Sequence, residues 1–430
     1  MVNPSSESRE NVGEKLIHIL PGTRVELLRM VSKAAEAQGC VLYLVGGFVR
    51  DLMLDVIGTD IDLVVEGDAI ALGISLSREH GGRVASHPRF GTAKWSLPTQ
   101  LAATNGVTTL DLVTARTEVY SRPSELPTVE MSSIKLDLRR RDFTINTLAI
   151  CVSGDGFGDL YDFWGGLHDL ERKRVRVLHS LSFRDDPTRA LRAVRLEQRL
   201  GFDLDQRTEQ LLDSALPLLG RVSGDRIRRE LEFILGEDQP ELILARLDEL
   251  GVLSSIHPAL VYRIDAGLGE SYQRARSIES GVRLIEIYFG LWLVRLSSED
   301  LSVVCGRLNM PRRLIRILKE ASALTRLMAD VSTAVIPSEL AALLDGKTQA
   351  SLQIMQSGAV SRVVRDRVKR YIEELQQVTT VITGDDLKRQ GLKPGPYFSE
   401  VLTRLRNAWL DGEVSSSEEE NALLKKLLSD

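Results

Sequence analysis

The sequence predicts an α+β protein, with an N-terminal α/β head followed by a long remainder that is entirely helical. Three observations favour this fold class. The first third alternates short apolar runs with helix-like patterns, and almost everything after Phe183 repeats its apolar residues with a period near 3.6. No repeat of fixed length interrupts either part. The 430 residues are enough for two to four domains.

Apolar patterning and glycines mark each element of the head. Residues 23–38 predict a helix that Gly39 ends, and VLYLV (41–45) predicts a short strand. A helix (48–55), a strand TDIDLVV (59–65) and a second helix (68–80) are expected next, and TAKWSL (92–97) and TTLDLV (108–113) are further strand-like runs. The segment 116–138 contains two prolines and no clear period, so we expect a mobile loop there.

From about Arg139 the pattern is helical, with one strand-like interruption at RVRVL (174–178). We expect breaks near GEDQ (236–239) and VIPS (335–338). Together with the end of the head, these breaks predict four domains, at 1–150, 151–236, 237–335 and 336–430. EVSSSEEEN (413–421) predicts the start of a helix with serine caps and first-turn carboxylates.

Composition excludes several classes of protein. The net charge of -5 gives no global case for nucleic acid, so any basic surface must be local, as in ERKRVR (171–176). The three cysteines lie far apart without metal-ligand spacing, which favours a reducing compartment. The polar start and the absence of a run of ~18 apolar residues argue against a membrane protein. We expect a cytoplasmic protein.

Acidic residues stand where a strand is predicted to be buried. Asp60 and Asp62 are two apart, so their side chains share one face of the strand, and Asp111 lies on another strand-like run. Burying unpaired carboxylates is costly, so the pattern predicts a compensating cation. Hard divalent cations prefer oxygen ligands, and two Mg²⁺ ions can clamp both oxygens of a phosphoryl transfer. For an isolated D-x-D, a strand cap and an ordinary ion pair is the more common explanation.

The segment before these aspartates favours a metal site over a strand cap and an ion pair. Gly46 and Gly47 follow a strand and open a helix, which is an arrangement that lets a backbone approach phosphates closely, and Arg50 follows one turn later. A glycine pair alone usually means a tight turn. A glycine pair followed, after a short helix, by D-x-D on a strand resembles the nucleotidyltransferase superfamily related to DNA polymerase beta.

Four more segments resemble, in order, the later motifs of the class II branch of that superfamily. They are RRRDFTINTLAI (139–150), DLYDFWGGLHDL (159–170), FRDDPTRALRAVRLEQRLGF (183–202) and GDRIRRELEFIL (224–235). This branch contains the bacterial tRNA CCA-adding enzymes and their poly(A) polymerase relatives. The resemblance covers most of the chain and implies a polymerase-beta-like head with an elongated all-α neck, body and tail. His168-Asp169 lies inside the third motif, so we interpret it as structural.

The resemblance also implies the site residues. Asp60, Asp62 and Asp111 match the catalytic carboxylates that hold two Mg²⁺ ions. The residues that match nucleotide-binding positions are Gly46, Gly47, Arg50, Arg141, Asp142, Asn146, Asp185, Asp186, Arg189, Arg192 and Arg195. Asp185 stands where many members of the family have glutamate, and its side chain is shorter by one carbon.

Base choice is predicted from one pair. Asp186 and Arg189 are three apart on a helix expected to start near Pro187, so they can present an acceptor beside a forked donor. Cytosine and adenine complement that pair, whereas uracil and guanine leave polar groups unpaired. The alternative is a simple salt bridge between positions i and i+3.

The predicted function is therefore a tRNA nucleotidyltransferase that adds AMP, with CMP addition left open. Its partners would be tRNA and ATP, or CTP, without a membrane, and a homodimer is left open. In the family a loop between the first two motifs is linked to A addition, and the corresponding 116–138 is present and long. Two alternatives stay open, namely a poly(A) polymerase for general RNA ends and a non-catalytic tRNA-binding protein with a relic head.

Overall fold

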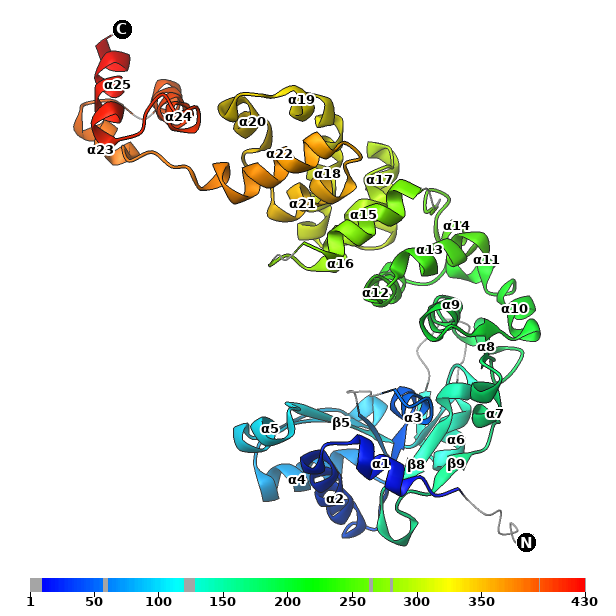
Figure 1. Ribbon diagram of the computed structural model, residues 1–430. Helices are drawn as coiled ribbons and strands as arrows, with labels where there is room; N and C mark the ends of the chain where they lie inside the picture. Colours follow the sequence, from blue (N-terminus) through cyan, green and yellow to red (C-terminus); the bar gives the residue numbers. More distant parts are fainter. Residues whose placement is uncertain are drawn as a thin grey trace, which may run out of the picture. The chain divides into compact units, whose positions relative to one another are not determined.

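The computed structural model describes residues 10–56, 61–119, 128–262, 266–278, 281–393 and 395–429. The chain divides into two compact units, Met1–Val222 and Ser223–Asp430 (Figure 1). The predicted four domains are a finer division than this and stay a prediction. The helix α12 (Gly224–Leu235), which the prediction places in the domain 151–236, belongs to the second unit.

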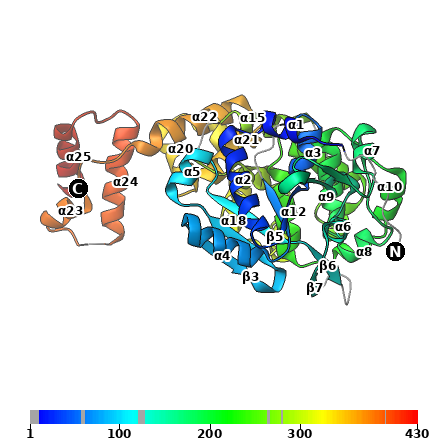
Figure 2. The same ribbon diagram turned by 90° about the horizontal axis from the view of Figure 1, so that it is seen from below.

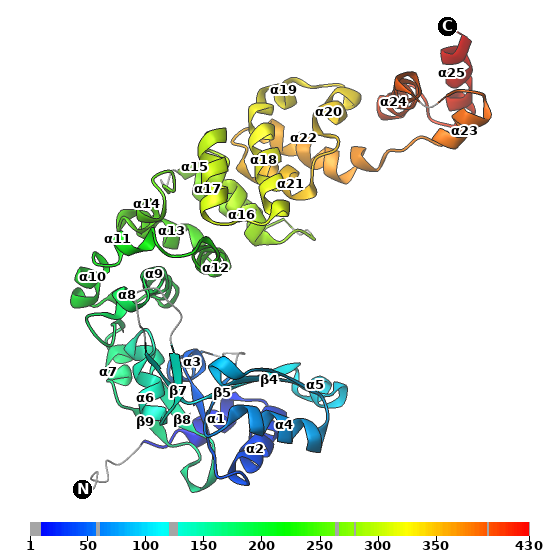
Figure 3. The same cartoon turned by 180° about the vertical axis from the view of Figure 1, so that it is seen from behind.

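The first unit is built on a seven-stranded mixed sheet with the order β3-β4-β5-β2-β1-β8-β9. Figure 3 shows β4, β5, β8 and β9 of this sheet. Its strands are β1 (Val41–Val45), β2 (Asp62–Glu66), β3 (Arg83–His87), β4 (Thr92–Ser96), β5 (Thr109–Thr114), β8 (Leu148–Cys151) and β9 (Leu160–Asp162). β2 and β5 run parallel, whereas every other neighbouring pair in this sheet is antiparallel.

Helices pack on both faces of this sheet. α2 (Gly22–Glu36) and α4 (Ala69–His80) lie side by side along one face (Figure 2). Gly73 in α4 brings this helix close to the sheet, since a β-carbon there would lie 3.2 Å from that of Ala93. α6 (Ile134–Arg139) covers the opposite face, where Ile134 and Leu138 pack into a core with Val45 and Val64. The sheet is thus buried on both sides over its central strands.

The remaining helices of the first unit are shorter or follow the sheet. They are α1 (Gly13–Ile19), α3 (Gly47–Met53), α5 (Thr99–Asn105), α7 (Gly166–Glu171), α8 (Ser182–Asp185), α9 (Arg189–Leu200), α10 (Gln206–Leu212) and α11 (Leu216–Leu219). The predicted strands at 41–45, 92–97 and 108–113 and the helices at 23–38, 48–55 and 68–80 are confirmed to within a few residues. Asp68 caps α4, because its side chain accepts hydrogen bonds from the backbone N–H groups of Ile70 and Ala71.

Two predictions about this unit are wrong. The segment 116–138 is not a loop throughout, because β6 (Arg116–Val119) pairs with β7 (Thr128–Met131) and α6 follows; residues 120–127 lie outside the described residues. The stretch after Arg139 is not helical throughout, because β8 and β9 complete the sheet. β8 is buried along its whole length, and a short buried apolar run carries no period that distinguishes a strand from a helix. The strand at 174–178 is confirmed in shorter form as β10 (Arg174–Val175), paired with β11 (Asp203–Leu204).

The second unit is helical throughout its described residues, as predicted. After α12 it contains α13 (Pro240–Glu249), α14 (Val252–Ile256), α15 (Ala266–Arg276), α16 (Leu284–Leu293), α17 (Ser298–Arg307), α18 (Arg312–Arg326), α19 (Met328–Thr333), α20 (Pro337–Leu344), α21 (Gln349–Gly358), α22 (Arg362–Glu373), α23 (Gly384–Arg389), α24 (Pro396–Leu410) and α25 (Ser417–Ser429). One core lies among α18–α22, and another gathers Leu387, Leu405 and Leu424 from the last three helices.

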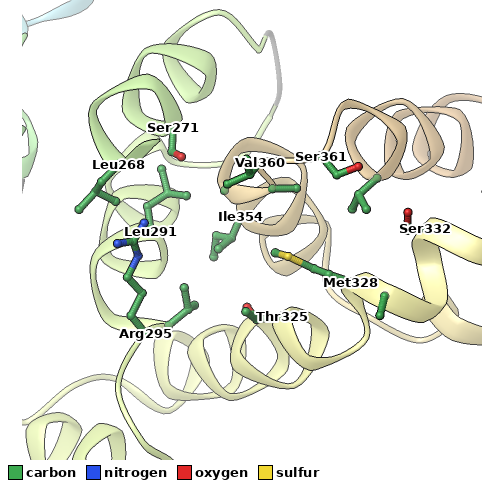
Figure 4. Close-up of a pocket in the computed structure, with 15 residues that line it drawn as sticks. Leu268, Ser271, Leu291, Arg295, Thr325, Met328, Ser332, Ile354, Val360 and Ser361 are labelled. Atoms are coloured by element: carbon green, nitrogen blue, oxygen red, sulfur yellow. The ribbon is translucent and has the colours of Figure 1, made fainter. Parts of the chain in front are cut away.

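The second unit also contains a mostly apolar cavity of about 450 Å³. Figure 4 shows Met328 reaching into it alongside Ile354, with Leu268 and Leu291 on another wall. Arg295 and several hydroxyl groups supply its polar lining.

Cys40, Cys151 and Cys305 are buried thiols outside any disulfide. No helix in the described part of the chain has the length and apolar character needed to cross a membrane.

Candidate nucleotidyltransferase site

Two of the predicted carboxylates face each other in the sheet. Asp62 begins β2, and Asp111 lies in the parallel strand β5 at the same register. Leu63 and Leu112, the next residues along, turn toward the α4 face, so the two carboxylates share the opposite face. Neighbouring strands are ~4.8 Å apart, which places these side chains within reach of one ion.

The expectation that these carboxylates are buried is wrong. Asp62 is exposed at the start of its strand, and the Asp111 side chain is 50% exposed. Lys94 from β4 lies opposite Asp111, with 3.2 Å between its Nζ and Oδ1 of Asp111. No large desolvation cost therefore forces a cation into this site, and the fit to one rests on the donors themselves.

Those donors suit a divalent metal ion, because carboxylate oxygens on neighbouring strands are hard ligands that can converge. Asp60 lies outside the described residues, so the third predicted ligand has no position here. Within the ranges that the structure describes, no group of three or more acidic, histidine or cysteine side chains gathers around one point. Asp62 and Asp111 are thus the described part of the predicted trio.

The glycine turn lies directly beside this pair. Gly46 joins β1 to α3 with φ +71°, a conformation that glycine adopts readily and other residues adopt at a cost. A β-carbon at Gly46 would lie 2.9 Å from Nη1 of Arg141 and 3.8 Å from Oδ2 of Asp62. The absence of a side chain therefore lets the arginine and the carboxylate approach the same turn.

Arg50 has a different environment from the predicted one. The residue is 4% exposed, and its guanidinium donates two hydrogen bonds to Oδ1 of Asp51, at 2.8 and 2.7 Å, and one to Oδ1 of Asn146, at 2.9 Å. A β-carbon at Gly47 would lie 3.5 Å from Nη2 of Arg50. The guanidinium therefore lies next to the glycine turn, with two of its five N–H groups donated to Asp51 and one to Asn146.

Arg141 is the guanidinium that reaches the open side of the turn. Nη2 is 3.2 Å from Oδ2 of Asp137, while Nη1 is the group nearest Gly46. The sequence prediction missed Asp137, which precedes Arg141 by four residues. Its signal was the i to i+4 acid–base spacing alone, and many solvent-exposed helices share that spacing.

A network of polar side chains connects the predicted nucleotide-binding residues. Asn146 Nδ2 donates to Oδ1 of Asp142 at 3.0 Å, and Arg192 lies between two carboxylates, with Nε 3.3 Å from Oδ2 of Asp142 and Nη2 2.8 Å from Oδ2 of Asp186. Burial raises the pKa of Asp142, but the Arg192 charge and the Asn146 hydrogen bond together hold the pKa below its ordinary value. The carboxylate stays ionised and keeps Arg192 in place.

The predicted pairing of Asp186 with Arg189 on one helix is not what the structure contains. Asp186 ends α8 and accepts hydrogen bonds from the N–H and hydroxyl of Thr188, whereas Arg189 begins α9. The Arg189 guanidinium is buried and donates to Ser182 Oγ and, at 2.9 Å, to the carbonyl oxygen of Arg140. Arg192, six residues after Asp186, pairs with the carboxylate instead, because the helical conformation is interrupted between α8 and α9.

A polar recess of about 330 Å³ lies at the same end of the unit. Its lining residues are Thr117, Leu136, Arg139, Arg140, His179, Asp185 and Arg189. Asp185 faces His179 across 3.9 Å, from Oδ2 to Nε2. Burial lowers the pKa of His179 below its ordinary value, and Asp185 offsets part of this effect. Arg195 lies one turn beyond Arg192 on α9 and is half-buried.

The described hydrogen bonds of Asp169, in the third motif, hold neighbouring segments of the head together. His168 is exposed on α7, whereas Asp169 is buried and accepts hydrogen bonds from Thr144 and Arg176. The two side chains therefore have separate environments.

A strand, a glycine turn and a helix beside two facing carboxylates define a nucleotidyltransferase head. Residues 42–176 match the family model described as "Poly A polymerase head domain", and residues 201–263 match "Probable RNA and SrmB- binding site of polymerase A". The chain belongs to the family of class II tRNA nucleotidyltransferases and poly(A) polymerases, as the resemblance predicted. Members of this family generally use divalent metal ions.

Three relatives illustrate the similarity. The chain is 36% identical to an A-adding tRNA nucleotidyltransferase of Geobacter sulfurreducens over 95% of its own length but about half (47%) of that protein. It is 30% identical to the A-adding tRNA nucleotidyltransferase of Halalkalibacterium halodurans, over 95% of this chain and 94% of that protein. The structure of the Thermotoga maritima CCA-adding enzyme complexed with tRNA is 31% identical and superposes with a TM-score of 0.74, over 98% of each chain.

Proposed function

We propose that this protein is a tRNA nucleotidyltransferase that adds AMP from ATP to the 3′ end of tRNA without a template. The observation that carries the proposal is the position of Asp62 opposite Asp111, beside the Gly46 turn and Arg141. The names of the relatives, which specify A addition and CCA addition, support the same activity. Addition of CMP as well is the second form of this proposal.

The reaction is a transfer of a nucleotidyl group. The oxygen of the tRNA 3′-hydroxyl forms a bond to the α-phosphorus of ATP, the bond from that phosphorus to the bridging oxygen breaks, and pyrophosphate leaves. Asp111 accepts the proton of the hydroxyl. The Arg141 guanidinium and the backbone at Gly46 and Gly47 bind the triphosphate, because a glycine turn permits close approach and the guanidinium supplies charge-assisted hydrogen bonds.

Asp60, Asp62 and Asp111 would hold two Mg²⁺ ions, with Asp60 and Asp62 shared between them. Bound Mg²⁺ supplies neutralisation of the developing negative charge and lowers the pKa of the attacking hydroxyl. The choice of Mg²⁺ rests on the all-oxygen donor set and on the phosphate chemistry.

We propose that the base is read near Asp186. A carboxylate accepts from the amino groups of adenine and cytosine but not from the carbonyl groups of uracil and guanine. Arg189 and Arg192, three and six residues after Asp186, would donate to the ring nitrogen beside each amino group. Arg195 and Asp185 contribute charge on the same two helices, and Asp142 with Asn146 would contact the ribose and triphosphate.

A primer-extension assay tests the function directly. Purified protein and Mg²⁺ would be incubated with tRNA transcripts that end in CC, in C, or before the tail, with labelled ATP and CTP supplied separately. We expect one AMP on the CC-ending transcript and then a stop. Continued addition of AMP to any RNA end would indicate a poly(A) polymerase, and no addition with retained tRNA binding would indicate a relic head.

The assay also separates A addition from CCA addition, because the transcripts without a tail are extended only if CTP is used. The long segment 116–138 favours A addition. A homodimer and a cytoplasmic location stay predictions, and sedimentation of the purified protein tests the first.

A further inference from the structure

One buried carboxylate of the head is absent from the proposed mechanism. Asp137 is on α6 and has no exposed surface. Its Oδ1 accepts hydrogen bonds from Nε and Nη2 of Arg140, at 3.0 and 2.7 Å, and from the backbone N–H of Arg116, at 3.2 Å; its Oδ2 accepts one from Nη2 of Arg141, at 3.2 Å. A fully buried carboxylate needs such partners to remain charged.

The contact with Arg141 sets the direction of that guanidinium. Both of its terminal nitrogens lie in one rigid plane, so holding Nη2 on Asp137 also constrains where Nη1 points. Nη1 is the atom that a β-carbon at Gly46 would contact, next to the carboxylate of Asp62. Asp137 therefore holds Arg141 with its second donor directed at the glycine turn.

The same carboxylate holds two further parts of the head. The Arg116 N–H is the first backbone group of β6, so Asp137 fixes the point where the β6–β7 hairpin begins. The carbonyl oxygen of Arg140, whose side chain it also binds, accepts a hydrogen bond from Arg189 at 2.9 Å. Asp137 thus contacts the first residue of β6 and Arg141 directly, and it reaches Arg189 through Arg140.

We propose that Asp137 is a positioning residue for nucleotide binding, which acts through Arg141 on the triphosphate. This inference rests on the proposed function, since it assumes that the Gly46 turn receives the triphosphate. The competing explanation is that Asp137 only stabilises the head. The two explanations differ in what happens when Arg141 has already been removed.

A double-mutant cycle with Asp137→Asn and Arg141→Gln makes this distinction. Asparagine keeps the size of the side chain but loses the charge that holds the guanidinium. We expect Asp137→Asn to raise the KM for ATP about tenfold, with the KM for tRNA within about twofold. In the Arg141→Gln background the same change should alter the KM for ATP by less than about twofold. An equal effect in both backgrounds, or no effect in either, overturns the proposal.

A matched control measures the general effect of breaking a buried ion pair. Glu286 is 7% exposed in the second unit and its carboxylate pairs with Arg313 at 3.1 Å. Glu286→Gln should leave the KM for ATP unchanged. A rise in KM equal to that of Asp137→Asn would show a nonspecific effect and overturn the proposal.

Arg141→Lys keeps the test decisive if no Asp137 variant folds. An ammonium group can reach Asp137 or the turn but cannot bridge both as a guanidinium does, so the KM for ATP should rise about tenfold. A wild-type KM in this variant overturns the proposal. Equilibrium binding of ATP, measured by calorimetry, gives the same comparison without turnover. A wild-type protein that binds ATP but adds no nucleotide would contradict the proposed function alone.

Discussion

Asp62 and Asp111 occupy the same register on two neighbouring parallel strands, with both carboxylates on the face of the sheet that α4 does not cover. β2 brings Asp62 to the Gly46 turn, where a β-carbon would lie 3.8 Å from its Oδ2. In a parallel pair the two residues advance together along the sheet, so a shift of one residue would place them on opposite faces. The register of β2 on β5 therefore determines whether the site exists.

The first prediction concerns Asp62. We expect Asp62→Asn to reduce nucleotide incorporation by at least ~10²-fold, because it removes a charged ligand at the reacting phosphate. Binding of tRNA, measured by filter retention, should stay near the wild-type level, since this carboxylate offers no attraction to a phosphate backbone. Glu66→Gln is the matched control, with the same change of charge at the end of the same strand, and should keep most of the activity. Normal turnover in Asp62→Asn would contradict the assignment.

The second prediction compares two glycines with the same backbone conformation. Gly46 has φ +71° and a β-carbon there would lie 2.9 Å from Arg141; Gly39 has φ +69° and open space around it. Alanine at either position should cost about 1 kcal/mol of stability, measured by thermal unfolding, because of the left-handed conformation. Only Gly46→Ala should raise the KM for ATP. An equal rise in Gly39→Ala would show that backbone strain, and not contact with Arg141, is responsible.

The third prediction concerns base choice. Asp186→Asn replaces an acceptor by a group that can also donate, so the preference for ATP over UTP and GTP should fall by about 10²-fold or more. Competition assays with mixed nucleotides on a CC-ending transcript measure this ratio. An unchanged ratio would move base recognition away from Asp186 and toward Arg189 in the recess.

The fourth prediction uses the pH dependence of Asp142. Its pKa is lowered in the folded protein, so its ion pair with Arg192 contributes stability above the ordinary aspartate pKa of about 4, and that stability is lost as pH falls through the folded value. At pH 7, Arg192→Met should destabilise the first unit by about 1–2 kcal/mol. The difference from wild type should shrink below pH 4.

Fluorine signals of 5-fluorotryptophan give this measurement for the first unit alone, because Trp95 and Trp164 belong to it and Trp292 and Trp409 to the second. In an Asp142→Asn background, Arg192→Met should show a smaller dependence on pH. A difference between Arg192→Met and wild type that stays constant from pH 7 to pH 3 would exclude Asp142 as its source.

Local patterns predicted much of the head and the order of its motifs. The apolar run 41–45, the glycines at 46 and 47 and the alternation around Asp62 are properties of a few neighbouring residues, and the structure keeps them as β1, the turn and β2. The alternation that marks a half-buried strand was absent from 148–151, which is buried along its length, so β8 looked helical. The pairing of β6 with β7 was missed because each strand has only four residues and the two prolines between them predict a loop.

By itself, the sequence determined which residue types are available, the helical second unit and the family to which the chain belongs. Tertiary structure decided which of those residues meet. Asp62 and Asp111 lie at the same register of two strands, and Arg50 forms a buried pair with Asp51. Asp186 pairs with Arg192, and Asp137 pairs with Arg141. The physical reason is that patterning along a chain reports burial and period, whereas the partner of a charged group depends on which distant segments pack against it.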